Sequence, residues 1–383
     1  MKIAVVCDVL GEENNGATIA TMTLIRYLKS RGHTVRVVCG DQDKKGQEGY
    51  YITPNMSFGK ALNKYVKKVG VAIAKVDEKV LHEALDGVDH IHVALPFFLG
   101  VKAVKWAKEN NVSVTASFHM QAENFTSHLK LDGFKTLNKA VYKFIYNHFY
   151  KHVDGIHFPT EFIRQTFEKN VKKQTRAYVI SNGVHSYVKK RESQKPDELK
   201  GKFVILTTGR YAREKAQDVL IKAVSCSKYK DKIKLILAGQ GIKKKKYEKL
   251  CKKRGVYCAM KFFSRTEIID VLNYSDMYVH PAKIELEGIA CLEAIVCGKL
   301  TIVSDSARSA TKGFAVSDKC VFKCGKEKDL ARVIDYFIEN PEQIKIHEQL
   351  YLNSAGAFNQ DECMLKMEQM MFELRDEKQK LKA

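Results

Sequence analysis

Short apolar runs alternate with stretches of helical periodicity along the chain, and this rhythm occurs twice. At the start, residues 2–8 are apolar, Thr18–Arg31 places apolar residues at helical spacing, and Val35–Cys39 is apolar again. Strands that alternate with helices in this way form parallel sheets whose faces are covered by helices. The further expected strands are His90–Ala94, Ser113–Phe118, Asp154–Phe158, Ala177–Ile180, Phe203–Thr208, Lys234–Ala238, Met277–His280 and Leu300–Val303.

A polar stretch separates the two cycles and divides the chain into halves of similar size. Residues 189–200 are mostly polar, carry Pro196 and are expected to be a linker. The sequence therefore predicts an α/β protein with an N-terminal domain over 1–188 and a C-terminal domain over 201–355. Residues 356–383 are expected to form a methionine-rich terminal helix.

Composition excludes several classes of protein. With 45% hydrophobic and 28% charged residues, the chain is neither disordered nor of low complexity. The longest uncharged apolar run, Val93–Val101, is too short to span a bilayer, and Asp8 interrupts the apolar start before it could serve as a signal peptide. The ten cysteines include no C-x-x-C pair. We therefore expect a cytoplasmic protein without a structural metal.

The net charge of +21 indicates a polyanionic partner. Between Leu62 and Val80, apolar residues recur at intervals of three or four and fall within roughly 80° of a helix surface. The opposite side carries Lys60, Lys64, Lys67, Lys68, Lys75 and Lys79. Such a helix can cover the core of its own domain, but an almost purely cationic polar face is typical of a helix on an anionic membrane.

Two other basic stretches have less specific patterns. Phe134–His152 interleaves lysines with aromatic residues, which could bind lipid or stack against a single-stranded nucleic acid. Because the chain lacks RNA-binding and helix-turn-helix motifs, we prefer the membrane and expect no nucleic acid partner. Lys243–Lys246 follows a Gly-x-Gly turn, and we interpret it as a solvated loop.

Two turns in the first half could contact phosphate or metal. The turn from Gly11 to Gly16 lies between a strand and a helix, where backbone amides can hold a phosphate. It lacks the G-x-G-x-x-G spacing of dinucleotide dehydrogenases. Asp41-Gln-Asp43 spells the D-x-D of metal-dependent transferases, but three residues match too often by chance to indicate a metal site.

The second half carries more specific chemistry. Gly209 and Arg210 end an apolar run and Lys215 follows, so two cations lie at the carboxyl end of a parallel strand, where they suit a diphosphate. Farther on, Gly288 is expected to open a helix whose free amides, including those of Ile289 and Ala290, can face phosphate. Glu285 before this helix and Glu293 within it can each accept hydrogen bonds from sugar hydroxyls.

Together these motifs resemble the GT-B glycosyltransferases of the retaining family 4 over nearly the whole chain. The matching pieces are Gly32-His33-x-Val35, Val179–Val184, Gly209-Arg210 with Lys215, and Glu285-x7-Glu293. The resemblance implies two Rossmann-like domains that face a cleft, with the terminal helix crossing back to the N-terminal domain. The N-terminal domain would bind the acceptor and the C-terminal domain the nucleotide sugar.

The resemblance also implies roles for individual residues. Arg210 and Lys215 would bind the donor diphosphate, Glu293 the ribose, and Glu285 the hydroxyls of the transferred sugar. His119 corresponds to the acceptor-domain histidine beside the donor sugar, although a lone histidine is more often structural. Gly16, Gly209 and the amides after Gly288 would complete the donor site.

Ser304–Thr311 replaces the usual Gly-Gly-x-x-Glu of the family and is similar to the 1,2-diacylglycerol glucosyltransferase branch, as is His119–Glu123. The expected reaction is transfer of glucose from UDP-glucose to diacylglycerol or monoglycosyl-diacylglycerol, without a metal or cofactor, at the inner face of the cell membrane. The alternatives are the same chemistry on a cell-envelope glycan or polyprenyl-linked acceptor, and a non-catalytic protein that binds nucleotide sugar or nucleic acid.

Overall fold

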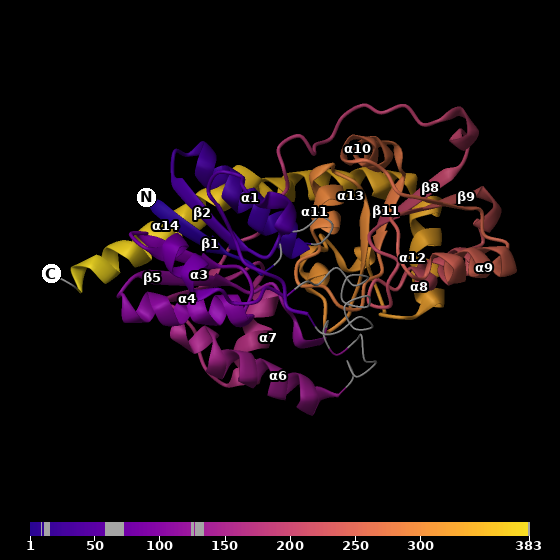
Figure 1. Cartoon of the computed structure of the whole chain (residues 1–383). Helices are drawn as coiled ribbons and strands as arrows, with labels where there is room; N and C mark the ends of the chain where they lie inside the picture. The colour runs from indigo at the N-terminus through magenta and orange to yellow at the C-terminus, as the bar shows by residue number, and fades with distance from the viewer. Residues whose placement is uncertain (9, 11–15, 58–72, 124–125, 127–133, 382–383) are drawn as a thin grey trace. The chain divides into compact units, whose positions relative to one another are not determined.

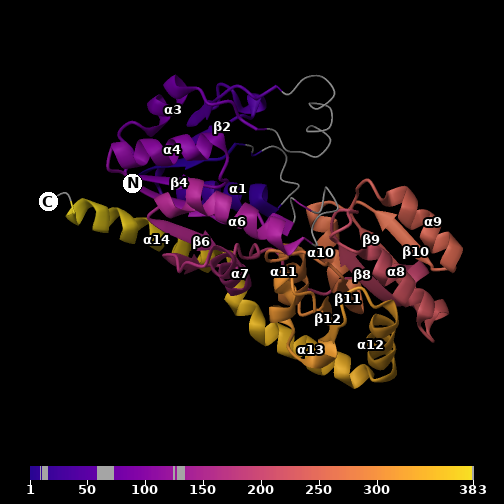
Figure 2. The same ribbon diagram turned by 90° about the horizontal axis from the view of Figure 1, so that it is seen from below.

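The computed structural model describes residues 1–8, 10, 16–57, 73–123, 126 and 134–381. These residues form two compact units. Of these, unit 1 contains residues 1–8, 10, 16–57, 73–123, 134–182 and 361–381, and unit 2 contains residues 126 and 183–360. Figures 1 and 2 show each unit as a sheet with helices packed on it. The predicted pair of doubly wound α/β domains is confirmed.

Unit 1 is built on a seven-stranded parallel sheet with the order β3-β2-β1-β4-β5-β6-β7. Its strands are β1 (Lys2–Val6), β2 (Thr34–Cys39), β3 (Tyr50–Ile52), β4 (His90–Val93), β5 (Ser113–Ser117), β6 (Gly155–Phe158) and β7 (Ala177–Val179). Its helices are α1 (Gly16–Ser30), α3 (Glu78–Leu85), α4 (Phe98–Glu109), α6 (Lys135–His148), α7 (Glu161–Val171) and α14 (Gln360–Lys380).

Unit 2 is built on a six-stranded parallel sheet with the order β10-β9-β8-β11-β12-β13. Its strands are β8 (Phe203–Thr208), β9 (Ile233–Ala238), β10 (Cys258–Lys261), β11 (Met277–His280), β12 (Thr301–Ser304) and β13 (Val321–Phe322). Its helices are α8 (Gln217–Cys226), α9 (Lys244–Arg254), α10 (Arg265–Tyr274), α11 (Ile289–Val296), α12 (Glu327–Glu339) and α13 (Pro341–Ser354).

Two expectations about chain organisation are corrected. Residues 189–200 group with unit 2 rather than separating the units. The reason is that Arg191 pairs with Asp270 of α10 (2.7 Å) and Lys195 pairs with Asp276 (2.7 Å). Lys243–Lys246 is not a loop, because α9 begins at Lys244 and buries Tyr247 and Cys251 one turn apart.

The terminal helix α14 groups with unit 1. Its methionines pack with β1, β2 and α1 in one hydrophobic cluster. Beside this cluster, the buried carboxylate of Glu368 lies 2.6 Å from His33 Nε2 and 3.5 Å from the guanidinium of Arg31. The hydroxyl of Tyr27 donates to the same carboxylate at 3.4 Å. The Gly-His motif after α1 therefore has a structural role, since His33 anchors the terminal helix.

A chain of hydrogen bonds between histidines and hydroxyls crosses the buried sheet of unit 1 through β4, β5 and β6. In order, the contacts are Ser113 Oγ to His90 Nδ1 (2.7 Å), His90 Nε2 to Thr115 Oγ1 (2.8 Å), Thr115 Oγ1 to His92 Nδ1 (2.9 Å), His92 Nε2 to Ser117 Oγ (2.9 Å), Ser117 Oγ to His157 Nδ1 (2.9 Å) and His157 Nε2 to the Ile180 carbonyl (2.7 Å). We call this set the histidine chain.

The end of the histidine chain determines its direction. The Ile180 carbonyl can only accept, so His157 carries its proton on Nε2 and accepts at Nδ1 from Ser117. Because Ser117 and Thr115 each donate their one hydroxyl proton to the next histidine of the histidine chain, they accept from the preceding one. His92 and His90 therefore also carry their protons on Nε2. A protonated ring would have two N–H donors and would break the sequence of donors and acceptors. Burial accordingly lowers the pKa of His90 to about 3 and that of His157 to about 4, and lowers that of His92 well below its usual value.

We predict that unit 1 loses stability as the pH falls below neutrality. The pKa of these histidines is lower in the folded chain than in the unfolded chain, so only the unfolded state takes up protons just below pH 6.5. These three histidines and His119, whose pKa burial also lowers to about 3, should together lower the free energy of unfolding by roughly 5 kcal/mol between pH 7 and pH 5.5. Urea unfolding followed by the fluorescence of Trp106, the single tryptophan, measures this, because Trp106 lies in α4 of unit 1.

A pair of variants identifies the source of the pH dependence. His92→Leu should reduce the slope of stability against pH by about a quarter, because one of four similar groups is removed. His185→Gln changes an exposed histidine in unit 2 and should leave the slope unchanged. A stability of unit 1 that stays constant from pH 7 to pH 5.5 would contradict the assignment of neutral histidines.

Candidate active site

The loop between β8 and α8 brings two cations to the carboxyl end of the unit 2 sheet. It begins at Gly209, whose amide donates to the Ala238 carbonyl of β9 (2.9 Å). The neighbouring loop lies so close that a Cβ on Gly239 would approach the Gly209 carbonyl oxygen to 2.1 Å. Arg210 is 54% exposed and lies 3.5 Å from Glu214, whereas Lys215 points into the unit. The loop thus offers one exposed cation and one inward-facing cation.

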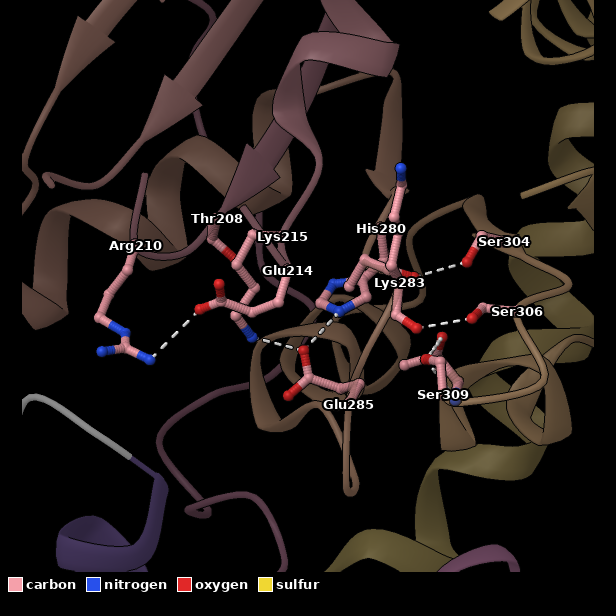
Figure 3. A network of polar contacts seen from close by, with 12 residues as sticks. Thr208, Arg210, Glu214, Lys215, His280, Lys283, Glu285, Ser304, Ser306 and Ser309 are labelled. Carbon is pink, nitrogen blue, oxygen red and sulfur yellow. Dashed lines mark hydrogen bonds and ion pairs between the residues drawn. The ribbon is translucent and has the colours of Figure 1, made fainter. Parts of the chain in front are cut away.

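Glu285 is the centre of the polar network in Figure 3. Its Oε2 forms an ion pair with Lys215 Nζ and lies 3.1 Å from His280 Nε2. Burial by itself raises the pKa of this carboxyl, but the charge of Lys215 and the hydrogen bond from His280 outweigh that effect and lower the pKa to about 2. Glu285 is therefore ionised at neutral pH, and its second oxygen, Oε1, remains available to accept hydrogen bonds from hydroxyl groups.

His280 is itself held from behind by two hydroxyl groups, that of the buried Tyr278 and that of the partly buried Thr208. Its Nδ1 lies 3.1 Å from the hydroxyl of Tyr278, which lies 2.9 Å from Thr208 Oγ1. These residues come from the adjacent parallel strands β11 and β8. Because the Glu285 carboxylate can only accept, His280 donates to it through Nε2–H. The orientation of the Glu285 side chain is therefore fixed by a hydrogen-bonded row that begins inside the sheet.

Serine residues at the end of β12 and just after it hold the backbone around Glu285. Ser304 Oγ donates to the Ala282 carbonyl and Ser306 Oγ to the Lys283 carbonyl, both at 2.6 Å (Figure 3). The Glu285 amide donates to the Arg308 carbonyl (3.1 Å), and the Glu285 carbonyl accepts from the Ala310 amide (2.9 Å). The segment that departs from the family pattern thus determines where the Glu285 loop lies.

Helix α11 begins directly after this loop, as predicted. Gly288 adopts φ +88°, a left-handed conformation that favours glycine, and it precedes the first helical residue. The amides of Ile289 and Ala290 precede the first N–H that can bond within the helix. One turn on, Glu293 is buried and pairs with Arg265 of α10 (2.6 Å). Burial raises the pKa of Glu293, and the charge of Arg265 opposes that shift.

The structure brings together some of the candidate residues of unit 2 and separates others. Lys215 and Glu285 are in direct contact, whereas Arg210 contacts Glu214 and Glu293 contacts Arg265. The sequence analysis missed His280, Tyr278 and Thr208, because their periodicity identifies them only as strand residues. A histidine directly before Pro281, at the carboxyl end of a strand, was the one available signal for His280.

The unit 1 candidates occupy the ends of separate elements. His119 follows β5 and is partly buried, with its ring centroid 6.0 Å from that of His157, the last histidine of the histidine chain. Burial lowers its pKa to about 3, so its ring is neutral at pH 7. Gly16 is the exposed first residue of α1. Residues 11–15 of the preceding turn lie outside the described residues.

The predicted amphipathic helix from Leu62 to Val80 is not one continuous helix, and this expectation is corrected. Lys60, Lys64, Lys67 and Lys68 lie outside the described residues. Over residues 73–77 the chain is not helical, since Ala74 pairs with Asn55 and the Lys75 amide donates to the Pro54 carbonyl (2.7 Å). Asp77 then caps the separate helix α3, which contains Lys79. Lys75 and Lys79 are both exposed.

Within the described part of the chain, no helix is long and apolar enough to cross a membrane. The same residues contain no group of three or more histidine, cysteine, aspartate or glutamate side chains placed to hold a metal ion. All ten cysteines are free thiols.

We predict that Lys215 and Glu285 contribute jointly to the stability of unit 2. Lys215→Ala leaves a largely buried carboxylate without its cation and should lower the free energy of unfolding by about 2 kcal/mol. Adding Glu285→Gln removes the unpaired charge and should restore most of that loss. A double-mutant cycle by urea unfolding, followed by circular dichroism, measures the coupling. Strictly additive effects of the two substitutions would contradict the pairing.

Comparison with known proteins follows the division into two units. The family described as "Glycosyltransferase Family 4" matches residues 14–186, and the family "Glycosyl transferases group 1" matches residues 188–353. Among curated proteins, the alpha-monoglucosyldiacylglycerol synthase of Streptococcus pneumoniae (strain ATCC BAA-255 / R6) is 23% identical over 381 residues, which cover 94% of this chain and 83% of the relative.

Among solved structures, Anabaena Alr3699/HepE in complex with UDP aligns with a TM-score of 0.75 at 16% identity and covers 97% of this chain and 100% of its own. The catalytic domain of cholesterol-alpha-glucosyltransferase from Helicobacter pylori is 41% identical over 40% of this chain and 96% of its own, with a TM-score of 0.39. The paired family matches and the two parallel-sheet units show that this chain is a glycosyltransferase with the GT-B fold, built from a family 4 domain and a group 1 domain.

Proposed function

We propose that the protein is a retaining, metal-independent glycosyltransferase that moves glucose from UDP-glucose to a membrane lipid and forms an α-glycoside. The acceptor would be diacylglycerol or monoglycosyl-diacylglycerol. The observation that carries the proposal is the ionised Glu285, held between Lys215 and His280 at the carboxyl end of the unit 2 sheet. This arrangement presents a carboxylate oxygen to sugar hydroxyls beside cations suited to a diphosphate.

Two relatives support the choice of donor and acceptor. HepE has been solved with UDP and with UDP-glucose, which supports a uridine nucleotide sugar as the donor. The pneumococcal relative is a synthase of a glucosylated diacylglycerol, which supports a lipid acceptor. The free thiols agree with a reducing compartment and therefore with a reaction at the cytoplasmic face of the membrane.

In the proposed reaction, the acceptor hydroxyl attacks the anomeric carbon from the face on which the diphosphate departs. The bond from the anomeric carbon to the phosphate oxygen breaks, the new glycosidic bond forms, and the acceptor proton moves to the leaving phosphate. Arg210 and Lys215 would stabilise the negative charge that develops on the diphosphate, a contribution commonly worth several kcal/mol. Because side-chain cations supply this charge, the reaction requires no metal.

The other candidates would position the donor. Glu285 would accept the hydroxyls of the transferred glucose through Oε1, and Glu293 would accept those of the ribose. Since Arg265 already contacts Glu293, the ribose would share that carboxylate with it or displace it. The amides of Ile289 and Ala290 would donate to the phosphate or the sugar. His119, neutral at pH 7, could donate or accept a hydrogen bond at the sugar.

The test is to incubate the purified protein with UDP-glucose and diacylglycerol in anionic-lipid vesicles and to analyse the lipids by mass spectrometry. We expect release of UDP together with a hexosyl-lipid, whose α configuration is read by NMR. Parallel reactions contain monoglucosyl-diacylglycerol, cholesterol or a polyprenyl phosphate as the acceptor. Product on the polyprenyl acceptor alone would contradict the lipid assignment, and a β-linked product would contradict retention.

We predict that Lys215→Ala lowers kcat by about 100-fold or more, because the departing diphosphate loses a charge partner. Steady-state kinetics with circular dichroism as a check of folding measures the effect. Lys222→Ala is the matched control, since Lys222 pairs with Asp218 on α8 (3.7 Å) and has no place in the proposed site. An unchanged kcat in Lys215→Ala would remove the proposed role of this lysine.

We also predict that chelation leaves the reaction intact. After dialysis against EDTA, the rate should stay within about twofold of the untreated rate, because Arg210 and Lys215 supply the charge that a metal ion supplies in metal-dependent transferases. UDP release in the presence and absence of added Mg²⁺ and Mn²⁺ measures this. Loss of activity that either ion restores would show that the reaction needs a metal.

A further inference from the structure

Helix α9 of unit 2 concentrates positive charge on one side. Of its eleven residues, six are lysines, one is arginine and one, Glu248, is acidic. Tyr247 and Cys251 are buried and fix which side faces the unit. At about 100° per residue, the opposite side carries five exposed lysines. They are Lys245, Lys246, Lys249, Lys252 and Lys253.

This distribution of charge is unfavourable for the helix itself. The first turn contains lysines and no acidic residue, although the amino end of a helix already carries partial positive charge. Lys245, Lys249 and Lys253 also follow one another at intervals of four, where like charges repel across a turn. Exposure of the helix to solvent does not by itself account for this unfavourable arrangement of charges.

Some other exposed lysines of unit 2 do have acidic partners. Lys228 pairs with Glu339 at 3.1 Å, for example, and Lys200 with Asp197. In the part of the chain that the structure describes, no ion pair includes a cation of α9. The charge of this helix is therefore available to a partner outside the unit.

Exposed apolar side chains flank the helix. Ile242 lies two residues before α9 and is 81% exposed, and Tyr257 lies three residues after it and is 51% exposed. The Lys234 ammonium lies 3.1 Å from the centre of the Tyr257 ring and covers one of its faces. Figures 1 and 2 both place α9 at the border of unit 2, where it packs against α8. We call Ile242, the five lysines and Tyr257 the α9 surface.

We infer that the α9 surface binds the headgroup layer of an anionic lipid bilayer. Lysines attract acidic headgroups, and an exposed isoleucine and tyrosine at the ends of the same helix can insert between lipids. A nucleic acid is less well matched, because Ile242 offers no ring for a base and Lys234 occupies one face of Tyr257. The inference rests on the proposed function for its choice of a membrane, and it gives unit 2 a membrane contact of its own.

The test measures binding to vesicles without donor or acceptor. The full chain is sedimented with phosphatidylglycerol–phosphatidylcholine vesicles, and the triple variant Lys245→Gln/Lys249→Gln/Lys252→Gln is compared with the unaltered chain. Each lysine near an anionic surface contributes roughly a factor of five, so the partition coefficient should fall by roughly 100-fold. Lys326→Gln/Lys328→Gln/Lys345→Gln removes the same charge from exposed positions on or next to α12 and α13 and should change binding by less than fivefold.

Activity toward a short-chain diacylglycerol dispersed in detergent separates this inference from the proposed function. The α9 variant should retain that activity while it loses vesicle binding, because none of its substitutions lies in the proposed donor site. Equal loss of binding in both triple variants would show that net charge, and not the α9 surface, determines binding, and would overturn the inference. Binding of single-stranded RNA without binding of anionic vesicles would overturn it too, whether or not the chain transfers glucose.

Discussion

A carboxylate that is removed from water requires nearby cations or hydrogen-bond donors, and Glu285 imposes this requirement on unit 2. The requirement is met by residues far apart in sequence. Lys215 comes from the loop after β8, His280 ends β11, and serines at the end of β12 and just after it hold the backbone around Glu285. These segments meet because parallel strands present their carboxyl ends at one edge of a sheet. The fold and the candidate site are therefore consequences of the same topology.

Unit 1 compensates its buried polar groups in a different way. Its histidine chain uses neutral rings and hydroxyls, each of which donates to one neighbour and accepts from the other, so no net charge is buried. The one buried carboxylate described on α14, Glu368, meets His33 and Arg31 and anchors the terminal helix beside a methionine-rich core. Unit 2 instead holds ionised groups in position, which suits recognition of a charged nucleotide.

Local periodicity in the sequence predicted much of the fold. It located strands such as Phe203–Thr208 and the start of α11 after Gly288, because buried strands and glycine turns have distinct local patterns. It failed between Leu62 and Val80, where the pairing of Ala74 and the cap at Asp77 override an amphipathic pattern. It also missed α9, because a helix of eleven residues that buries only Tyr247 and Cys251 shows almost no periodic pattern of apolar residues. The contact of His280 with Glu285 depends on how the β11 loop folds back, which spacing alone does not specify.

The most direct test of the account is a crystal structure of the chain with a non-transferable analogue of UDP-glucose. The account predicts the diphosphate within hydrogen-bond distance of Arg210 and Lys215, and the glucose hydroxyls against Glu285, with His280 still bonded to that carboxylate. A nucleotide bound away from the loop between β8 and α8, or a sugar that makes no contact with Glu285, would contradict it.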